Sequence, residues 1–100
     1  MRVSFERSGG FTGIPLTIAV DTDTLSPDKA TQLRQLVESS DFFHLPPNLR
    51  GSGQSDRFQY RVKVEENGQQ HEVIVDESVV TDNLKPLLDW LLDAVRQRQR

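Results

Sequence analysis

The most regular pattern of polar and apolar residues lies on either side of Asn67-Gly68. Apolar side chains alternate with polar ones over most of 57–76, which is the period of a β-strand. Asn-Gly is typical of a type I′ turn, because both central residues of that turn need positive φ angles. A two-residue turn would gather the apolar residues on one face and place Lys63 opposite Glu72 on the other, where the charges can pair. The turn and the alternation therefore predict the same β-hairpin.

Residues 2–20 predict a second pair of strands. Polar and apolar residues alternate in 2–6 and again in 14–20, on either side of the glycine-rich segment 8–13. Pro15 has no N–H to donate to a neighbouring strand, so we expect the second strand to start at an edge or a bulge of the sheet. Because 8–13 leads into a strand and not into a helix, a hairpin loop or bulge is favoured over a phosphate-binding loop.

Two segments carry apolar residues at the spacing of an amphipathic helix. The first begins at Ser26-Pro27, where the hydroxyl can cap the helix and the proline suits its first turn, and it ends near Ser39 or Ser40. The second has a broad apolar stripe over 84–95 and follows three residues that can cap a helix, 81–83. Each helix should bury one face against the strands.

The order of the elements, ββαββα, predicts an α+β fold in which 1–100 form a single domain. The simplest packing is a four-stranded, mostly antiparallel sheet with both helices packed on one face. When the chain is traced up and down this sheet, the turn at 9–13, the loop at 45–56 and the link at 77–81 gather at one end. The Asn67-Gly68 turn lies at the other end.

The composition is that of a small acidic domain. The chain has no cysteine, 12 Lys and Arg against 15 Asp and Glu, and a net charge of −3. Its charges are interspersed, and the basic cluster Arg96, Arg98 and Arg100 suits the C-terminus of a helix, so we expect no nucleic-acid partner. No segment approaches the ~20 apolar residues of a membrane span, and the first residues lack the apolar core of a signal peptide. We therefore expect a cytoplasmic protein that does not contact membranes.

The residue types give little support for catalysis or metal binding. His44 and His71 are far apart, no cysteine is present, and no HExxH-type spacing occurs, so we expect no metal site. A partly buried imidazole with a local hydrogen bond is the expected role of each histidine. Neighbouring carboxylates stand at the ends of elements, where solvated turn or capping roles are usual. We expect no catalytic residue and no cofactor; an enzyme that uses either histidine is the minor alternative.

The loops at one end of the sheet are the predicted binding site for a partner protein. Phe11 stands between glycines on a turn, where an apolar side chain either folds back over the core or is presented to a partner. Leu49 offers a second apolar side chain in the neighbouring loop. The predicted partner-binding residues are Gly9, Gly10, Phe11, Thr12, Leu49 and Arg50.

Several segments, in order and with their spacing, resemble the Emfourin family: 5–14, 33–38, 41–46, 56–60 and 86–91. These are small bacterial proteins, and the characterised example inhibits protealysin, a thermolysin-like zinc metalloprotease. The resemblance implies an inhibitor that occupies the active-site cleft of such a protease and has no enzymatic activity of its own. A stable scaffold with a presented loop is enough for that role.

An interaction module that does not inhibit a protease is the alternative function. It could self-associate through an exposed sheet edge or through the free face of the sheet. A monomer is the expected state.

Overall fold

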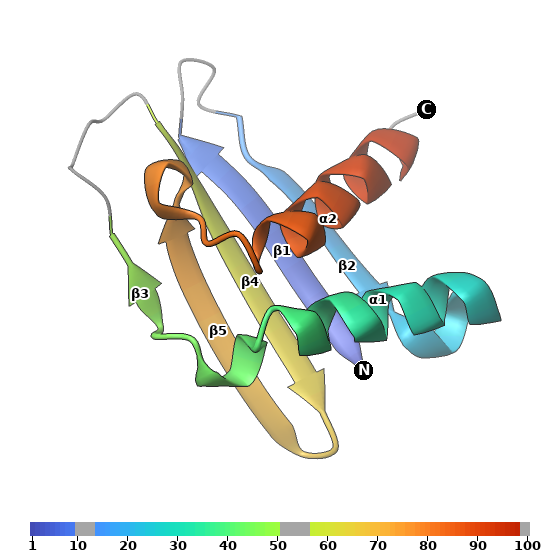
Figure 1. Ribbon diagram of the computed structural model, residues 1–100. Coiled ribbons are helices and arrows are strands. Elements are labelled where there is room, and N and C mark those ends of the chain that lie inside the picture. Colours follow the sequence, from blue (N-terminus) through green and yellow to red (C-terminus); the bar gives the residue numbers. More distant parts are fainter. Residues whose placement is uncertain (10–13, 51–56, 99–100) are drawn as a thin grey trace.

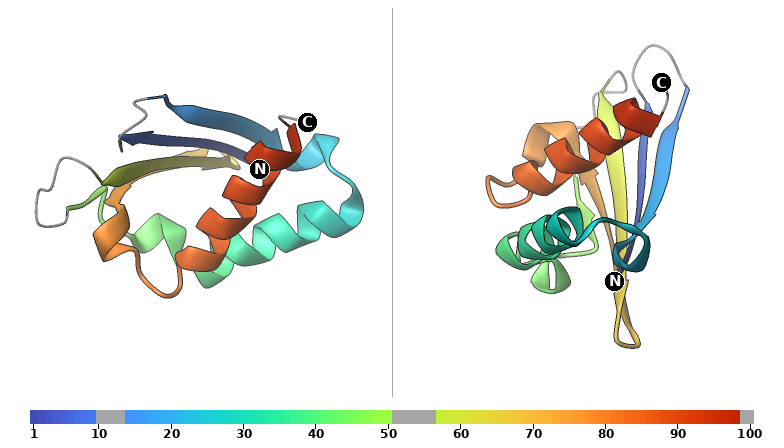
Figure 2. Two further views of the ribbon diagram at one scale, coloured as in Figure 1. Left: turned by 90° about the horizontal axis from the view of Figure 1, so that it is seen from above. Right: turned by 90° about the vertical axis from the view of Figure 1, so that its right-hand side faces the viewer.

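The protein is an α+β domain of two layers, as the sequence predicts. The computed structural model describes residues 1–9, 14–50 and 57–98. One layer is a sheet, and two helices cover one of its faces (Figures 1 and 2). The strands are β1 (Arg2–Gly9), β2 (Leu16–Asp21), β3 (Asn48–Leu49), β4 (Phe58–Glu66) and β5 (Gln69–Asp76). The helices are α1 (Pro27–Ser39) and α2 (Lys85–Arg98), with short 3-10 turns η1 (Thr22–Thr24), η2 (Phe42–His44) and η3 (Glu77–Val79).

The sheet has five strands, so the prediction of four strands is wrong. Their order is β2-β1-β4-β5-β3, and all neighbours are antiparallel except β3, which runs parallel to β5. The additional strand lies in a segment that we expected to be a loop. The Ile74 N–H donates to the Pro47 carbonyl at 2.9 Å, so this segment satisfies backbone groups along the outer side of β5. Two residues after a pair of prolines carry no alternation from which a strand could be predicted.

The predicted β4–β5 hairpin is confirmed in its turn and its register. Asn67 and Gly68 both have positive φ angles, 51° and 80°, as a type I′ turn requires. Lys63 lies opposite Glu72 in the ladder. The expected ion pair between them is wrong, however, because the Lys63 ammonium lies 3.2 Å from a carboxylate oxygen of Glu65 on its own strand. The register follows from the turn. An exposed lysine can pair with any of several neighbouring carboxylates, because the energies of such surface ion pairs are similar.

The helices begin as predicted, and their apolar faces form the core together with the sheet. The Ser26 hydroxyl accepts a hydrogen bond from the Lys29 N–H at 3.4 Å, and Thr81 accepts one from the Leu84 N–H at 3.2 Å. The Trp90 indole N–H donates to the Gln32 side chain at 2.8 Å and so links α2 to α1. The buried apolar side chains of the sheet are Val3, Phe5, Ile18, Val20, Val62, Val64, Val73 and Val75, and those of the helices include Leu33, Val37, Leu87, Leu88, Leu91 and Val95.

The described strand ends lie where the tracing predicted them, while residues 10–13 and 51–56 lie outside the described part of the chain, and Leu45 lies beside His71, away from the predicted end. Gly9 pairs with Phe58 and Leu49 pairs with Val75, so the C-terminal end of β1, the start of β4 and the end of β3 share one border (Figure 1). The η3 turn follows β5 at the same border. We call this border the loop end: it comprises Gly9, Leu49, Phe58 and η3, together with the residues adjoining them in the chain. The Asn67-Gly68 turn lies at the opposite end.

The core should be sensitive to truncation of the side chains that the helices bury completely. Leu33 of α1 is fully buried, and truncating it to alanine should lower the free energy of unfolding by about 2–5 kcal/mol. Leu36 on the same helix is only half-buried, so Leu36→Ala is a matched control with a smaller loss. Chemical denaturation of the two variants measures both losses. Equal losses would contradict this account of the core.

Candidate functional site

Gly9 closes the β1–β4 ladder at the loop end. Its φ angle is +88°, in the region that favours glycine. A Cβ atom at this position would lie 2.6 Å from the backbone carbonyl oxygen of Arg57, so no other residue fits without moving β4. Gly9 therefore lets the backbone at the end of β1 approach the backbone of Arg57 closely, at this border of the sheet.

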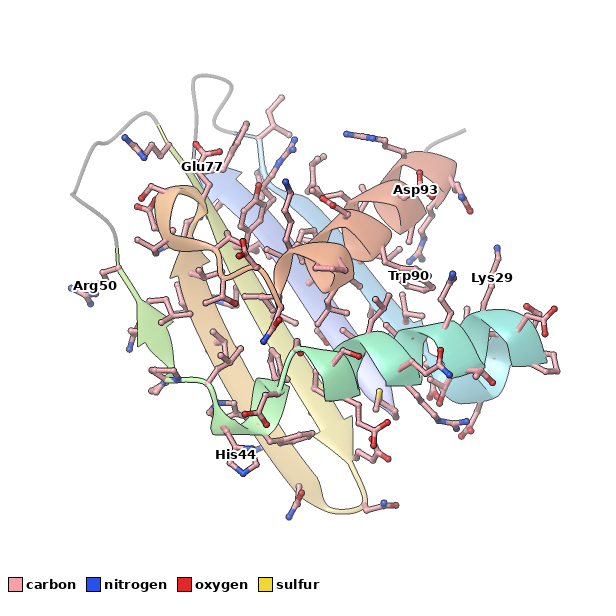
Figure 3. All side chains as sticks on the ribbon, in the orientation of Figure 1. Lys29, His44, Arg50, Glu77, Trp90 and Asp93 are labelled. Carbon is pink, nitrogen blue, oxygen red and sulfur yellow. The ribbon has the colours of Figure 1, made fainter. Side chains whose placement is uncertain are left out.

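Phe58 connects three elements at the loop end. The guanidinium of Arg7, on β1, lies over its ring at 4.2 Å from the ring centre, in a cation–π contact. Its backbone N–H donates to a carboxylate oxygen of Glu77, on η3, at 2.9 Å. Figure 3 shows Glu77 next to the start of β4. The first contact joins β1 to β4, and the second fixes η3 against the start of β4.

The η3 turn is stabilised from within by Asp76. Its carboxylate accepts hydrogen bonds from the Ser78 N–H at 2.9 Å and from the Ser78 hydroxyl at 2.8 Å. The backbone bond, followed by the hydroxyl bond, lowers the pKa of Asp76 below its ordinary value because both bonds favour the charged form. The turn therefore prefers the ionised carboxylate.

Tyr60 lies beneath this cluster on the core side of β4. Its ring stacks against Phe5 with ring centres 6.1 Å apart. Burial raises the pKa of the Tyr60 hydroxyl, and the negative charge of Glu77 raises it further, while Arg7 acts in the opposite direction. The pKa of the Tyr60 hydroxyl therefore depends on the charges of Glu77 and Arg7 at the loop end.

Ile14 is the one large apolar side chain that is mostly exposed among residues 1–9, 14–50 and 57–98. It is 69% exposed and precedes Pro15, just before β2 begins at Leu16. The alternating pattern placed Ile14 on the apolar face of the strand, so its exposure was not predicted. The proline after it was the available signal, because it favours a strand that starts later.

The structure describes three of the six predicted partner-binding residues, and all three lie at the loop end. Gly9 ends β1 and Arg50 is exposed just beyond β3 (Figure 3). Leu49 is half-buried and packs on the core, so only part of its side chain could face a partner. Gly10, Phe11 and Thr12 lie outside the described residues. The assignment of these six residues to partner binding stays a prediction.

The two histidines serve local structure at the opposite half of the domain. His71 is half-buried, as expected, but its partner is not local: its Nε2 lies 2.7 Å from the carbonyl oxygen of Leu45, 26 residues earlier in the chain. His44 is exposed, with its Nδ1 2.6 Å from a carboxylate oxygen of Asp41, so the expectation of a partly buried imidazole is wrong there. It lies on η2, which places its side chain on the outside of the turn, while Phe42 fills the core. Within the described residues, no three His, Asp or Glu side chains lie close enough together to hold a metal ion.

The comparison with protein families decides which family this scaffold represents. A sequence model named Emfourin matches residues 5–92, from β1 to α2. The chain belongs to the Emfourin family. No curated protein and no solved structure matches it. The Emfourin match spans all of β2, α1, β3, β4 and β5, so the loop end of this emfourin lies within the shared part of the chain.

Neither helix of this emfourin, over the part that the structure describes, has both the length and the apolar character needed to cross a bilayer.

The charge on Glu77 can be separated from its hydrogen bond by two substitutions. Glu77→Gln keeps an oxygen that can accept the Phe58 N–H but removes the charge. The Tyr60 pKa should therefore fall, yet stay above its ordinary value because burial is the larger cause. Glu77→Ala removes the acceptor as well and should also lower the free energy of unfolding by up to about 1 kcal/mol. Near-ultraviolet absorbance follows the pKa, since the chain has one tyrosine, and denaturation follows the stability. An unchanged Tyr60 pKa in Glu77→Gln would contradict this arrangement.

Ser78→Ala should raise the Asp76 pKa toward its ordinary value, because it removes the hydroxyl bond and leaves the backbone bond. A carboxyl group with a lowered pKa in the folded state stabilises the fold above its ordinary pKa. That contribution is lost as the pH falls through the lowered pKa. With a higher Asp76 pKa, Ser78→Ala should lose this contribution to the free energy of unfolding at a higher pH than the wild type does. An NMR titration of the Asp76 carboxyl carbon measures the change. Ser39→Ala, an exposed change on α1, is the control and should leave this titration as in the wild type.

Proposed function

We propose that this member of the Emfourin family inhibits a thermolysin-like zinc metalloprotease by occupying its active-site cleft. The observation that carries the proposal is the family match over residues 5–92. The inhibitor would supply shape and backbone rigidity, and the protease would supply all the chemistry. No metal ion or cofactor of its own enters the proposal.

The loop end is the surface that we assign to the protease. In its described part, the β1–β4 ladder extends to Gly9 and Phe58, and the hydrogen bond between Phe58 and Glu77 holds η3 in place. Groups that are held in place before binding lose less conformational freedom on binding, which favours affinity. A standard inhibitor interface buries roughly 800 Å² on each partner, an area that one end of a small domain can supply.

Ile14 is the apolar contact that we assign to this interface, with Arg50 as a charged contact. An exposed isoleucine gains about 25 cal/mol for each Å² of apolar surface that a partner removes from water. Contacts of this kind near the centre of an interface contribute most of the binding energy. Arg50 is exposed beyond β3 and can pair with a carboxylate at the rim.

Adding the purified protein to a thermolysin-like protease should reduce peptide hydrolysis in a dose-dependent manner. Ile14→Asp should weaken inhibition by about fivefold or more, because a buried contact is lost and a charge must be desolvated. Gln35→Glu adds the same charge on the exposed side of α1, far from the loop end, and should inhibit like the wild type. Thermal unfolding checks that both variants remain folded.

Two different failures can be distinguished. If the wild type leaves hydrolysis unchanged at high micromolar concentration across several such proteases, the proposed function fails for this protein. If the wild type inhibits and Ile14→Asp inhibits equally well, inhibition stands but the assignment of the loop end through Ile14 fails.

A further inference from the structure

We propose that the outer edge of β2 binds an extended strand of a partner protein, with apolar residues at alternate positions and a carboxylate facing Arg98. This surface is the side of the sheet and not its loop end. The proposal does not rest on protease inhibition, and it concerns binding by added strand pairing.

The two edges of the sheet differ in how much backbone they offer. β3 has two residues, whereas β2 has six, and among the described residues β2 pairs with β1 alone. An edge strand leaves alternate N–H and C=O groups free to pair, and proteins usually protect such edges with charged residues, prolines or bulges. In β2 the one charged residue is Asp21 at its end, and Pro15 stands just before the strand. The backbone between them, Leu16–Val20, carries none of these protections.

A hollow lies under the β2 edge, between the strand and the two helices. Its volume is about 490 Å³, and its apolar lining comes from Ile18, Val20, Leu25, Trp90 and Ala94. Ile18 and Val20 are each 8% exposed, the highest values among the buried apolar side chains of the described residues, because the helices do not close this side completely. An incoming strand paired with β2 would point every second side chain into this hollow. Those side chains should be apolar.

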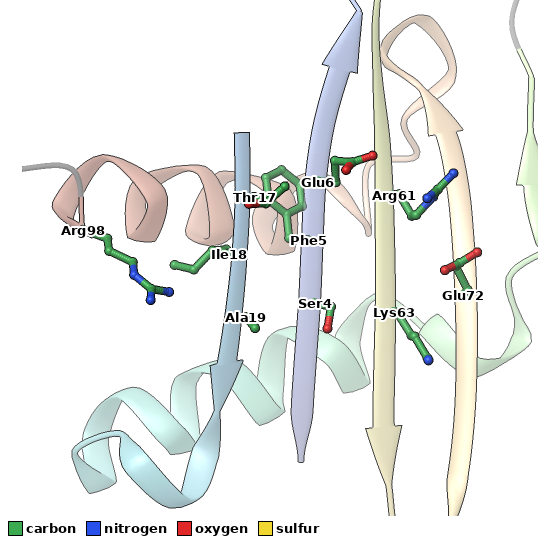
Figure 4. A pocket seen from close by; sticks show the side chains of 10 residues that line it. All are labelled: Ser4, Phe5, Glu6, Thr17, Ile18, Ala19, Arg61, Lys63, Glu72 and Arg98. Carbon is green, nitrogen blue, oxygen red and sulfur yellow. The ribbon is translucent and has the colours of Figure 1, made fainter. Parts of the chain in front are cut away.

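Arg98 supplies the charge that selects the partner strand. From the end of α2 it extends along the free edge of β2 toward Ile18 (Figure 4), and it also borders a second hollow of about 450 Å³ on the outer face of the sheet. Lys29 and Asp93 complete the charged rim of the first hollow (Figure 3). This rim carries two positive charges and one negative charge on a chain whose net charge is −3. A carboxylate on the incoming strand complements it.

A second copy of this chain fits the edge less well than a partner strand does. Antiparallel pairing of β2 with itself about Ile18 would bring the Arg98 side chains of both copies to the two-fold axis, where they repel each other. β2 has one carboxylate, Asp21, which stands at its end and three residues from Ile18, the residue beside Arg98. The charges therefore favour a partner with an acidic residue in the pairing segment.

The probe for this proposal is a short capped synthetic peptide of alternating valine and threonine, with one central threonine replaced by glutamate. Trp90 lines the hollow and is the only tryptophan in the chain, so its fluorescence should change and saturate on titration. The largest backbone amide NMR shift changes should fall in Leu16–Asp21. The same peptide with N-methylated amides, which cannot complete the ladder, should not bind.

Charge exchange tests the role of Arg98. Arg98→Glu should weaken binding of the glutamate peptide by about fivefold and improve binding of a peptide with lysine in its place. Arg96→Glu makes the same change in charge two residues earlier on α2, where the side chain lines a neighbouring groove and not this hollow. That control should bind both peptides nearly as the wild type does.

Three results would overturn the proposal. The first is no saturation up to about 1 mM peptide, the weak limit of measurable specific binding. The second is an equal effect of Arg96→Glu and Arg98→Glu on peptide binding. It would mean that binding depends on the net charge of the protein and not on a contact with Arg98. The third is self-association of the wild type in sedimentation experiments, with concentration-dependent shifts in Leu16–Asp21, which would make a second copy the occupant.

Discussion

The pairing of β1 with β4 is the interaction on which the rest of the domain depends. Each strand also belongs to a hairpin that is local in sequence, β1–β2 or β4–β5, and only this ladder joins the two hairpins into one sheet. It links segments separated by α1 and η2, so it forms against the entropy of closing a long loop. Burial of Val3, Phe5, Val62 and Val64 beneath the helices offsets that entropy. The hairpins, the helices and the core therefore form together.

The features that could be predicted from the sequence are those with local causes. The type I′ turn at Asn67-Gly68 requires positive φ angles, and the start of α1 requires a capping hydroxyl followed by proline, so both could be located to the residue. The two-layer packing followed from the order of the elements, and the Emfourin resemblance was confirmed over most of the chain. These predictions needed no knowledge of which distant segments meet.

The features that could not be predicted depend on long-range contacts or on small energy differences. β3 exists because η2 directs the chain alongside β5, not because Asn48 and Leu49 prefer a strand. The exposure of Ile14 depends on where pairing with β1 stops, which the alternating pattern overestimates by two residues. Of the predicted partner-binding residues, the three that the structure describes lie at the expected end of the sheet, and their role in binding stays a prediction. The Arg7–Phe58–Glu77 contacts were not predicted, because they join three segments far apart in the sequence.

The unequal borders of the sheet bear on how this protein avoids forming fibres. Open-ended polymers of β domains grow when one border of each molecule adds to the opposite border of the next, so that every addition exposes a fresh template. Here the β3 border is interrupted: β3 pairs only with Ile74 and Val75 and covers part of β5, so this border offers no continuous long strand that matches β2. Such a mismatch disfavours the repeated addition of one border to the other. The short parallel strand β3 thus allows the β2 border to remain accessible while open-ended assembly stays disfavoured.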